Sequence, residues 1–332
     1  IAHFSVSIVA RGSGRSAVLS AAYRHCARMD YEREARTVDY TRKQGLVHEE
    51  FLLPAGAPAW ARALIAEERF LNWQIAFPGV WDRWDDEGRH GGFDAVVGNP
   101  PWDRIKLQQV EWFAARRPEI ALAARASDRA KLIAKLKADG DPLFEDYQKA
   151  EARAAATTRM ARTSGHYPLL SRGDVNLYSL FVERAQALVK PGGMVGLLTP
   201  SGIASDLSAS AFFRGVATEG RLKALYDFEN RRPRYVLEPF FPDVDSRFKF
   251  CALIASPSRR FDAATCGFFL QAAMETRDPD RAFPITAADF AGVNPNTGTA
   301  PIFRSRRDVA LTMLFDAGRS YEERVMAEQF SQ

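Results

Sequence analysis

Four consecutive residues, Asn99-Pro100-Pro101-Trp102, have the types needed to handle a planar aromatic amine. Such an amine is a poor nucleophile because its lone pair is delocalised into the ring, so an enzyme must pull on its hydrogens with acceptors. The Asn99 side chain and the Pro100 carbonyl are suitable acceptors, and Pro101 stiffens the loop at low entropic cost. Trp102 offers a face on which a base stacks, and a base from duplex DNA reaches such a pocket only after it is extruded.

The residues before this motif predict a strand. Phe93 to Gly98 form a short apolar run of the kind found in buried parallel sheets. The motif therefore lies at the carboxyl end of a strand. We expect Asp94 to shape the end of this strand rather than to act as a base.

The sequence after the motif alternates helices with strands. From Gln108 to Thr163 the chain is rich in Ala, Arg, Lys and Glu at helical spacing, and Gly140-Asp141-Pro142 interrupts it. This pattern predicts a pair of long helices inserted beside the sheet. Further helices are predicted at 177–190 and 209–218, and strands at 194–198, 222–228 and 248–255. This order predicts an α/β fold, with one half of a doubly wound, Rossmann-like sheet.

The first residues have a different character. Residues 4–10 alternate as a strand, Gly12-Ser13-Gly14 makes a turn, and the chain from Ser16 to Arg28 is predicted to be helical. A β-hairpin is predicted from Thr37 to Leu53. We place a junction between Ala63 and Asn72, where an aromatic, loop-rich passage begins.

Bulk composition limits the class of protein. The chain has 332 residues, a net charge of +4 and a sequence pI near 9.0, which suits a polyanion-binding protein without requiring one. Solvated helix faces explain the basic clusters equally well. No apolar run is long enough for a membrane span and no secretory signal is evident, so we expect a cytoplasmic protein. Cys26, Cys251 and Cys266 are too dispersed for a disulfide framework or a zinc site.

The segment from Phe93 to Trp102, together with Lys190-Pro191-Gly192-Gly193-Met194-Val195-Gly196, resembles the amino-group DNA methyltransferases of large restriction-modification proteins. The resemblance covers roughly residues 71–308. It implies methyl transfer from S-adenosylmethionine to adenine N6 by direct displacement, with no metal. Asn99 and Pro100 would contact the amine, Trp102 would stack on the base, and the residues Asn176, Tyr178 and Phe181 would form the pocket wall.

One part of that family pattern is missing from the sequence. The resemblance implies a donor pocket made by a glycine-rich turn and a following acidic residue, both upstream of the Asn-Pro-Pro turn. The segment from Asn72 to Gly92 has neither, and the cofactor-binding residues stay unknown. The upstream turn around Gly12 and Gly14 is weak evidence on its own, and we assign it to a different part of the chain.

Residues 3–65 resemble the start of conjugative relaxases of the MobA/MobL and TraA-like group, on motifs such as Ala21-Ala22-Tyr23-Arg24. In that group a tyrosine attacks the phosphate of one DNA strand beside a metal held by clustered histidines, and Tyr23 lies at the matching position. A tyrosine hydroxyl needs activation by a metal or a base. The histidines His48, His90 and His166 are isolated, so we expect Tyr23 to be inactive as a nucleophile.

The hypothesis that follows is a fusion of two truncated pieces. Residues 1–66 would be the relaxase-like fragment and 67–92 a junction, followed by a partial methyltransferase domain over 93–270 with its helical insert at 103–165, and a C-terminal extension over 271–332. The inferred function is adenine-specific DNA methylation with DNA as the partner. The alternatives are a catalytically inactive DNA-binding protein and a relaxase remnant.

Overall fold

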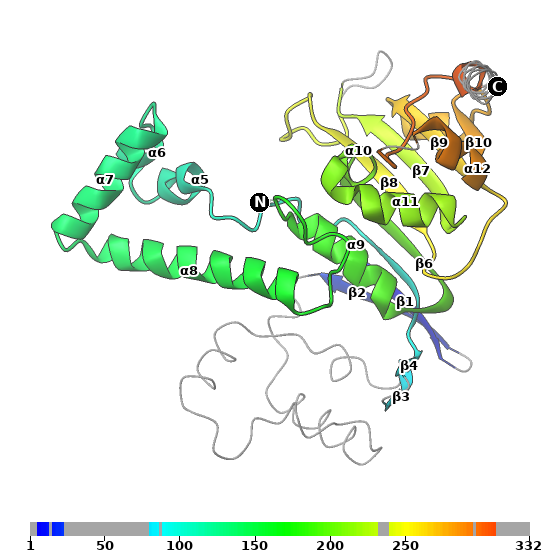
Figure 1. The fold of residues 1–332 in the computed structure, drawn as a ribbon, viewed down its shortest axis with the longest axis horizontal. Coiled ribbons are helices and arrows are strands. Elements are labelled where there is room, and N and C mark those ends of the chain that lie inside the picture. Colours follow the sequence, from blue (N-terminus) through cyan, green and yellow to red (C-terminus); the bar gives the residue numbers. More distant parts are fainter. Residues whose placement is uncertain are drawn as a thin grey trace, which may run out of the picture.

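The computed structural model describes a mixed α/β fold. The residues that it describes are 5–12, 15–22, 80–85, 88–231, 239–294 and 297–309. Their main feature is an eight-stranded sheet with the order β10-β9-β7-β8-β6-β5-β1-β2 (Figure 1). The strands are β1 Ser5–Gly12, β2 Arg15–Ala22, β5 Phe93–Gly98, β6 Val189–Pro200, β7 Leu222–Glu229, β8 Lys249–Ala255, β9 Ala263–Leu270 and β10 Ala282–Thr286.

The strand directions in this sheet are mixed. β5, β6, β7 and β9 share one direction, whereas β1, β8 and β10 run antiparallel to their neighbours. The predicted strands at 194–198, 222–228 and 248–255 are confirmed. β8 lies between β6 and β7 and pairs antiparallel with both, because a strand that returns without a crossover helix reverses its direction.

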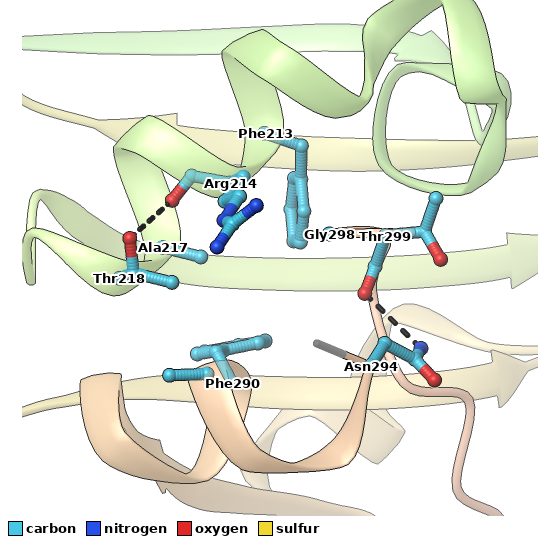
Figure 2. A pocket seen from close by; sticks show the side chains of 9 residues that line it. Phe213, Arg214, Ala217, Thr218, Phe290, Asn294, Gly298 and Thr299 are labelled. Atoms are coloured by element: carbon cyan, nitrogen blue, oxygen red, sulfur yellow. Dashed lines mark hydrogen bonds between the residues drawn. The ribbon is translucent and has the colours of Figure 1, made fainter. Parts of the chain in front are cut away.

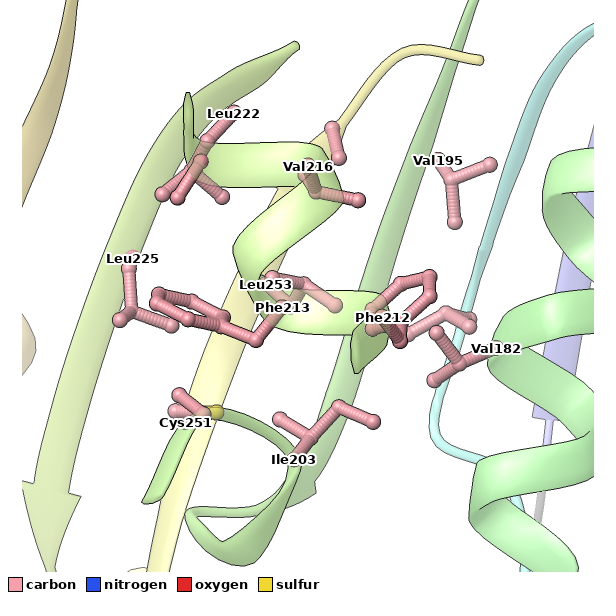
Figure 3. Packing of buried hydrophobic residues seen from close by; sticks show 14 of the residues in the cluster. Val182, Val195, Ile203, Phe212, Phe213, Val216, Leu222, Leu225, Cys251 and Leu253 are labelled. Carbon is pink, nitrogen blue, oxygen red and sulfur yellow. The ribbon is translucent and has the colours of Figure 1, made fainter. Parts of the chain in front are cut away.

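A layer of helices packs on one face of the sheet. Its members are α9 Leu177–Leu188, α10 Gly202–Ser205, α11 Ser210–Thr218 and α12 Ala287–Val293. Phe212 and Phe213 of α11 lie over Leu225 and Leu253 of the strands, and they join Val182 of α9 in one continuous core (Figure 3). Among the described residues we find no helical layer on the opposite face, so the doubly wound arrangement stays a prediction.

Close backbone contact joins β5 to the start of β6. A Cβ added at Gly193 would lie 3.0 Å from the carbonyl oxygens of Phe93 and Asp94, and one at Gly92 would lie 2.6 Å from Lys190 N. The Lys190 ammonium forms an ion pair with Asp94 at 2.5 Å. Asp94 thus links the start of β5 to the chain that enters β6, and its expected role in shaping the strand's end stays a prediction.

The insert between β5 and α9 forms a helical arm that projects from the sheet (Figure 1). It comprises α5 Gln109–Ala114, α6 Pro118–Ala121, α7 Ala126–Ala138 and α8 Pro142–Thr163. The second of the two predicted long helices is confirmed as α8, whereas the first is divided into α5, α6 and α7. The junction between α7 and α8 is the predicted one: Gly140 has a φ of 64°, and the Asp141 side chain accepts a hydrogen bond from Leu143 N at the start of α8.

The predicted helix beginning at Ser16 is wrong over its first part. Arg15–Ala22 is β2, which pairs antiparallel with β1 along its whole length. A short run of Ala, Val and Leu is compatible with a helix or a strand. Pairing with β1 overrides the helical propensity of the alanines in this run. The predicted strand near residues 4–10 is confirmed as β1. The predicted hairpin between Thr37 and Leu53 and the junction near Ala63 lie outside the described residues.

Two smaller features complete the described fold. β3 Trp81–Asp85 and β4 Gly88–Gly91 form a separate two-stranded sheet just before β5. β10, within the segment expected to extend from the domain, adds an edge strand beside β9. None of the described helices has the length and apolar character required to cross a membrane.

Candidate functional site

Asn99 lies immediately after β5, at the carboxyl edge of the sheet. Its side-chain oxygen Oδ1 is buried and has no hydrogen-bond partner. An unpaired buried acceptor costs about 1–3 kcal/mol, and native proteins leave few of them. The carboxyl edge is also where open α/β sheets bind their ligands. A ligand N–H directed at this oxygen would relieve that cost.

The residues around Asn99 keep this oxygen unpaired. Pro100 and Pro101 follow it directly, and neither has a backbone N–H to donate. The indole Nε1 of Trp102 donates instead to the backbone oxygen of Leu198, 3.4 Å away on β6. The turn therefore leaves the Asn99 oxygen free to accept a hydrogen bond, because the indole N–H of Trp102 is bonded to Leu198.

Trp102 belongs to an aromatic cluster on the face opposite the main helical layer. Its ring stacks on Phe250 of β8 with centroids 6.2 Å apart, and the edge of Phe241 meets it at 5.4 Å. Phe228 and Phe240 pack on Phe250 from the far side. We call these five rings the aromatic cluster. A base that stacks on Trp102 would have to share its ring with Phe250 or Phe241.

The chain just after the motif pairs with the chain just before α9. Ile105 N donates to Val175 O at 3.2 Å, and Leu177 N donates to Asp103 O at 2.9 Å. Arg104 and Asn176 form an antiparallel bridge between these hydrogen bonds. The structure thus brings Asn176, at the N-terminus of α9, next to the Asn99 turn despite the long insert between them.

The other two predicted wall residues, Tyr178 and Phe181, lie on α9. Tyr178 is buried in the main core at 5% exposure, and this burial raises the pKa of its hydroxyl. Phe181 is half-buried one turn further along α9. The pocket-wall role assigned to both by the resemblance stays a prediction.

A polar group lies at the same edge of the sheet, on β7. Asp227 is 7% exposed and accepts a hydrogen bond from the Ser201 hydroxyl, just beyond β6. Burial raises the pKa of the Asp227 carboxyl, although Ser201 and the Lys249 ammonium favour its charged form. Lys249 also lies 3.8 Å above the ring of Phe269. This group was not predicted from the sequence, because its members come from different elements.

The described residues do not fit the donor that the resemblance implies. The strand next to β5 is β1, which runs antiparallel to it with Val6 opposite Gly98. Gly12 is paired with Arg15 at the far end of β1, so Gly12 lies at the opposite edge of the sheet from Asn99. No glycine-rich turn lies beside Asn99 in the described part of the chain.

Two further sequence expectations concern the cysteines and the metal. Cys251 is buried, and this burial raises the pKa of its thiol to about 12, so it is inert at neutral pH. Within the described ranges no cluster of histidine, cysteine or carboxylate side chains has the arrangement of a metal site. Tyr23 and His48 lie outside the described residues.

A small hollow lies between α11 and α12, away from the Asn99 turn (Figure 2). Phe213 and Phe290 form its apolar sides, and the Arg214 side chain reaches across it. Asn294 closes one end by donating to Thr299 O at 3.2 Å. None of the predicted site residues contributes to this hollow.

Sequence reasoning missed Phe241 and Phe250 as partners of Trp102. The motif-like runs around both phenylalanines were visible, but their packing on Trp102 depends on how the sheet orders its strands. Asn230, which binds the backbone of Phe241, was also missed. Its position directly after the predicted strand at 222–228 was the one signal that could have found it.

The N-terminal part of the chain is similar to conjugative mobilisation proteins. The MobA/MobL family model matches residues 15–83. The conjugal transfer protein TraA of Rhizobium radiobacter is 81% identical over 77 residues, which are 23% of this chain and 7% of that protein. The mobilization protein MobL of Acidithiobacillus ferridurans is 44% identical over 59 residues, which are 18% of this chain and 16% of that protein. The chain thus spans only a small part of these relatives.

Restriction-modification proteins are among the solved structures that the chain is similar to. One is the methyltransferase subunit of a type I system from Streptococcus thermophilus, at 10% identity and a TM-score of 0.33, covering 45% of this chain and 35% of that one. Another is the type IIG restriction endonuclease BpuSI, at 14% identity and a TM-score of 0.24, covering 32% and 12%. TM-scores this low do not establish a function for this chain.

Proposed function

We propose that residues 93–270 contain the target-base site of an adenine-specific DNA methyltransferase. The observation that carries the proposal is the buried, unpaired Oδ1 of Asn99, at the carboxyl end of β5 and followed by two prolines and Trp102. An exocyclic amine supplies the N–H that this acceptor lacks. The sequence resemblance around this turn supports adenine N6 as that amine.

The chemistry proposed for the chain's own residues is limited to the amine. Asn99 Oδ1 and the Pro100 carbonyl would accept hydrogen bonds from its hydrogens, which raises electron density on nitrogen and fixes the direction of its lone pair. Trp102 would hold the plane of the base. The methyl donor implied by the resemblance is S-adenosylmethionine.

Base binding is tested with duplex DNA that carries 2-aminopurine opposite an abasic site, because an unpaired base costs less to extrude. Entry of the analogue into a protein pocket changes its fluorescence. We expect saturable change with the wild-type chain and about a tenfold weaker response with Asn99→Ala or Trp102→Ala. Asn294→Ala and Trp112→Ala are the matched controls, since both residues lie away from the turn. Equal responses from all five proteins would refute the proposed site.

Donor binding is tested separately by titration calorimetry with S-adenosylmethionine. Saturable binding, followed by methyl transfer to mixed DNA that depends on Asn99, would support a complete methyltransferase. The absence of binding, together with a working base response, would support a base site that lacks its own donor pocket.

A relaxase remnant is the second candidate function, and the MobA/MobL match over residues 15–83 favours it. The matched region includes Tyr23, the nucleophile by resemblance. Nicking of a supercoiled plasmid with a transfer origin, lost in Tyr23→Phe, would support this function. A salt-sensitive affinity for any duplex without either activity would instead support a DNA-binding protein.

A further inference from the structure

Asn230 is the buried link between β7 and a largely exposed loop. It directly follows the last residue of β7 and is 1% exposed. The residues from Pro242 to Phe248 that follow Phe241 are mostly exposed, so few apolar contacts hold this part of the chain. A buried carboxamide at such a point must find partners for its donors and its acceptor.

The Asn230 carboxamide uses both of its N–H donors and its acceptor oxygen on that loop. Its Nδ2 donates to Phe241 O at 3.0 Å and to Val244 O at 2.9 Å. Its Oδ1 accepts from Phe241 N at 3.0 Å. Both backbone polar groups of Phe241 are therefore held by one side chain, much as a neighbouring strand would hold them.

This clamp determines where the ring of Phe241 lies. The ring meets Trp102 edge-on at 5.4 Å and Phe250 at 4.9 Å. The neighbouring side chains are open to solvent: Phe240 is 40% exposed and Phe248 is 57% exposed. Phe241 is thus the member of the loop that reaches Trp102, and its backbone is the part that Asn230 fixes.

We propose that Asn230 is a positioning residue of the base site, which holds Phe241 against Trp102 and so sets the space in which a base stacks. The inference rests on the proposed function, because it concerns the same site. Asn230 touches neither the amine nor the base, and it acts through the Phe241 backbone. Its loss should therefore change how a base is held after DNA has bound, and leave overall DNA affinity almost unchanged.

The test compares Asn230→Asp and Asn230→Leu with the wild-type chain, using the same 2-aminopurine duplex. Aspartate keeps the shape and one acceptor but places a second oxygen against the two carbonyls. We expect pocket occupancy to fall about tenfold, since the hydrogen bonds to both carbonyls are lost. Affinity for the same duplex without the analogue, measured by anisotropy at fixed salt, should change less than about twofold because phosphate contacts dominate it.

Two further measurements separate positioning from a general structural role. A protonated aspartate regains one donor, so occupancy in Asn230→Asp should recover as the pH falls through the carboxyl range, whereas Asn230→Leu should not recover. Asn294→Asp is the matched control, because Asn294 also donates to a loop carbonyl but far from Trp102. Circular dichroism of each variant checks that the sheet is folded.

Each outcome decides between the two proposals. Normal occupancy in both Asn230 variants, with occupancy lost in Asn99→Ala, overturns the positioning role and leaves the base site standing. Equal loss of occupancy and of DNA affinity, or loss of the fold in both variants, also overturns it. Normal occupancy in Asn99→Ala and Trp102→Ala overturns the base site and this inference together.

Discussion

The sheet and the helical arm are built around cores of very different extent. The sheet, with α9 to α12, shares one cluster that runs from Phe93 to Phe303. The arm has five buried residues of its own, centred on Phe113 and Tyr147. The aromatic cluster and Asn99 lie with the sheet. The two clusters share no residue, so a substitution inside the arm should leave the packing around the proposed base site unchanged.

The largest effect is expected from Phe213→Ala in the sheet core. Phe213 is 1% exposed and packs edge-on against Phe290. Removing a buried phenylalanine costs about 3–5 kcal/mol through lost burial and a residual cavity. Urea denaturation followed by circular dichroism should show this loss in the free energy of unfolding of the sheet. A loss near zero would mean that the shared core is not continuous.

A smaller, local effect is expected from Phe113→Ala in the arm. Phe113 is fully buried against Trp112 and Tyr147, so its truncation should cost about 3 kcal/mol. Hydrogen exchange should rise across α5 to α8 while β6 to β8 keep their protection, because the two clusters are separate. Equal loss of protection in the sheet would contradict the proposed independence.

The next prediction concerns the junction inside the arm. Asp141 accepts a hydrogen bond from Leu143 N at 2.9 Å and also binds the Arg117 guanidinium. Loss of such a cap costs about 0.5–2 kcal/mol, so Asp141→Ala should lower the stability of the arm by that amount. Lys131→Ala, which removes an exposed pair with Asp128, should change stability by less than about 0.5 kcal/mol. Equal losses of stability in Asp141→Ala and Lys131→Ala would contradict a capping role for Asp141.

The smallest expected effect is a change in pH dependence within the sheet. Burial raises the pKa of Asp227, so its protonated form is favoured in the folded state. Its contribution to stability is fully present below the ordinary carboxyl pKa and is lost as the pH rises through the raised pKa. Asp227→Asn cannot ionise, so its unfolding free energy should fall less across this window than that of the wild type. Parallel profiles from denaturation at several pH values would contradict this.

Much of the fold was predictable because its signals are local. The strand from Phe93 to Gly98, the break at Gly140 and the strand at 222–228 each follow from short apolar runs or from turn residues. The state of Ser16 to Ala22 was not predictable in this way. Its residues suit a helix and a strand, and pairing with β1 decides between them.

The candidate site was predictable only in part, for a related reason. The Asn99 turn is contiguous and was found directly from its residue types. The order of the strands in the sheet decides which other residues lie near this turn, and no periodicity in the sequence encodes that order. The rings of Phe241 and Phe250 and the amide of Asn230 are examples. The neighbour of β5 was equally hidden from the sequence, because the antiparallel pairing of β1 with β5 is a tertiary contact.

The length of α8 means that a small rotation at one end of the helix produces a large displacement at the other. Its 22 residues rise about 1.5 Å each, so the helix is about 33 Å long. A rotation of only about ten degrees at its Thr163 end would move the opposite end by roughly 6 Å, which is more than one helical turn. Any adjustment where Ala161 of α8 packs on Val175 and Leu180 would therefore be amplified at α7. A pair of fluorophores on α7 and α11 would report it as a change in energy transfer.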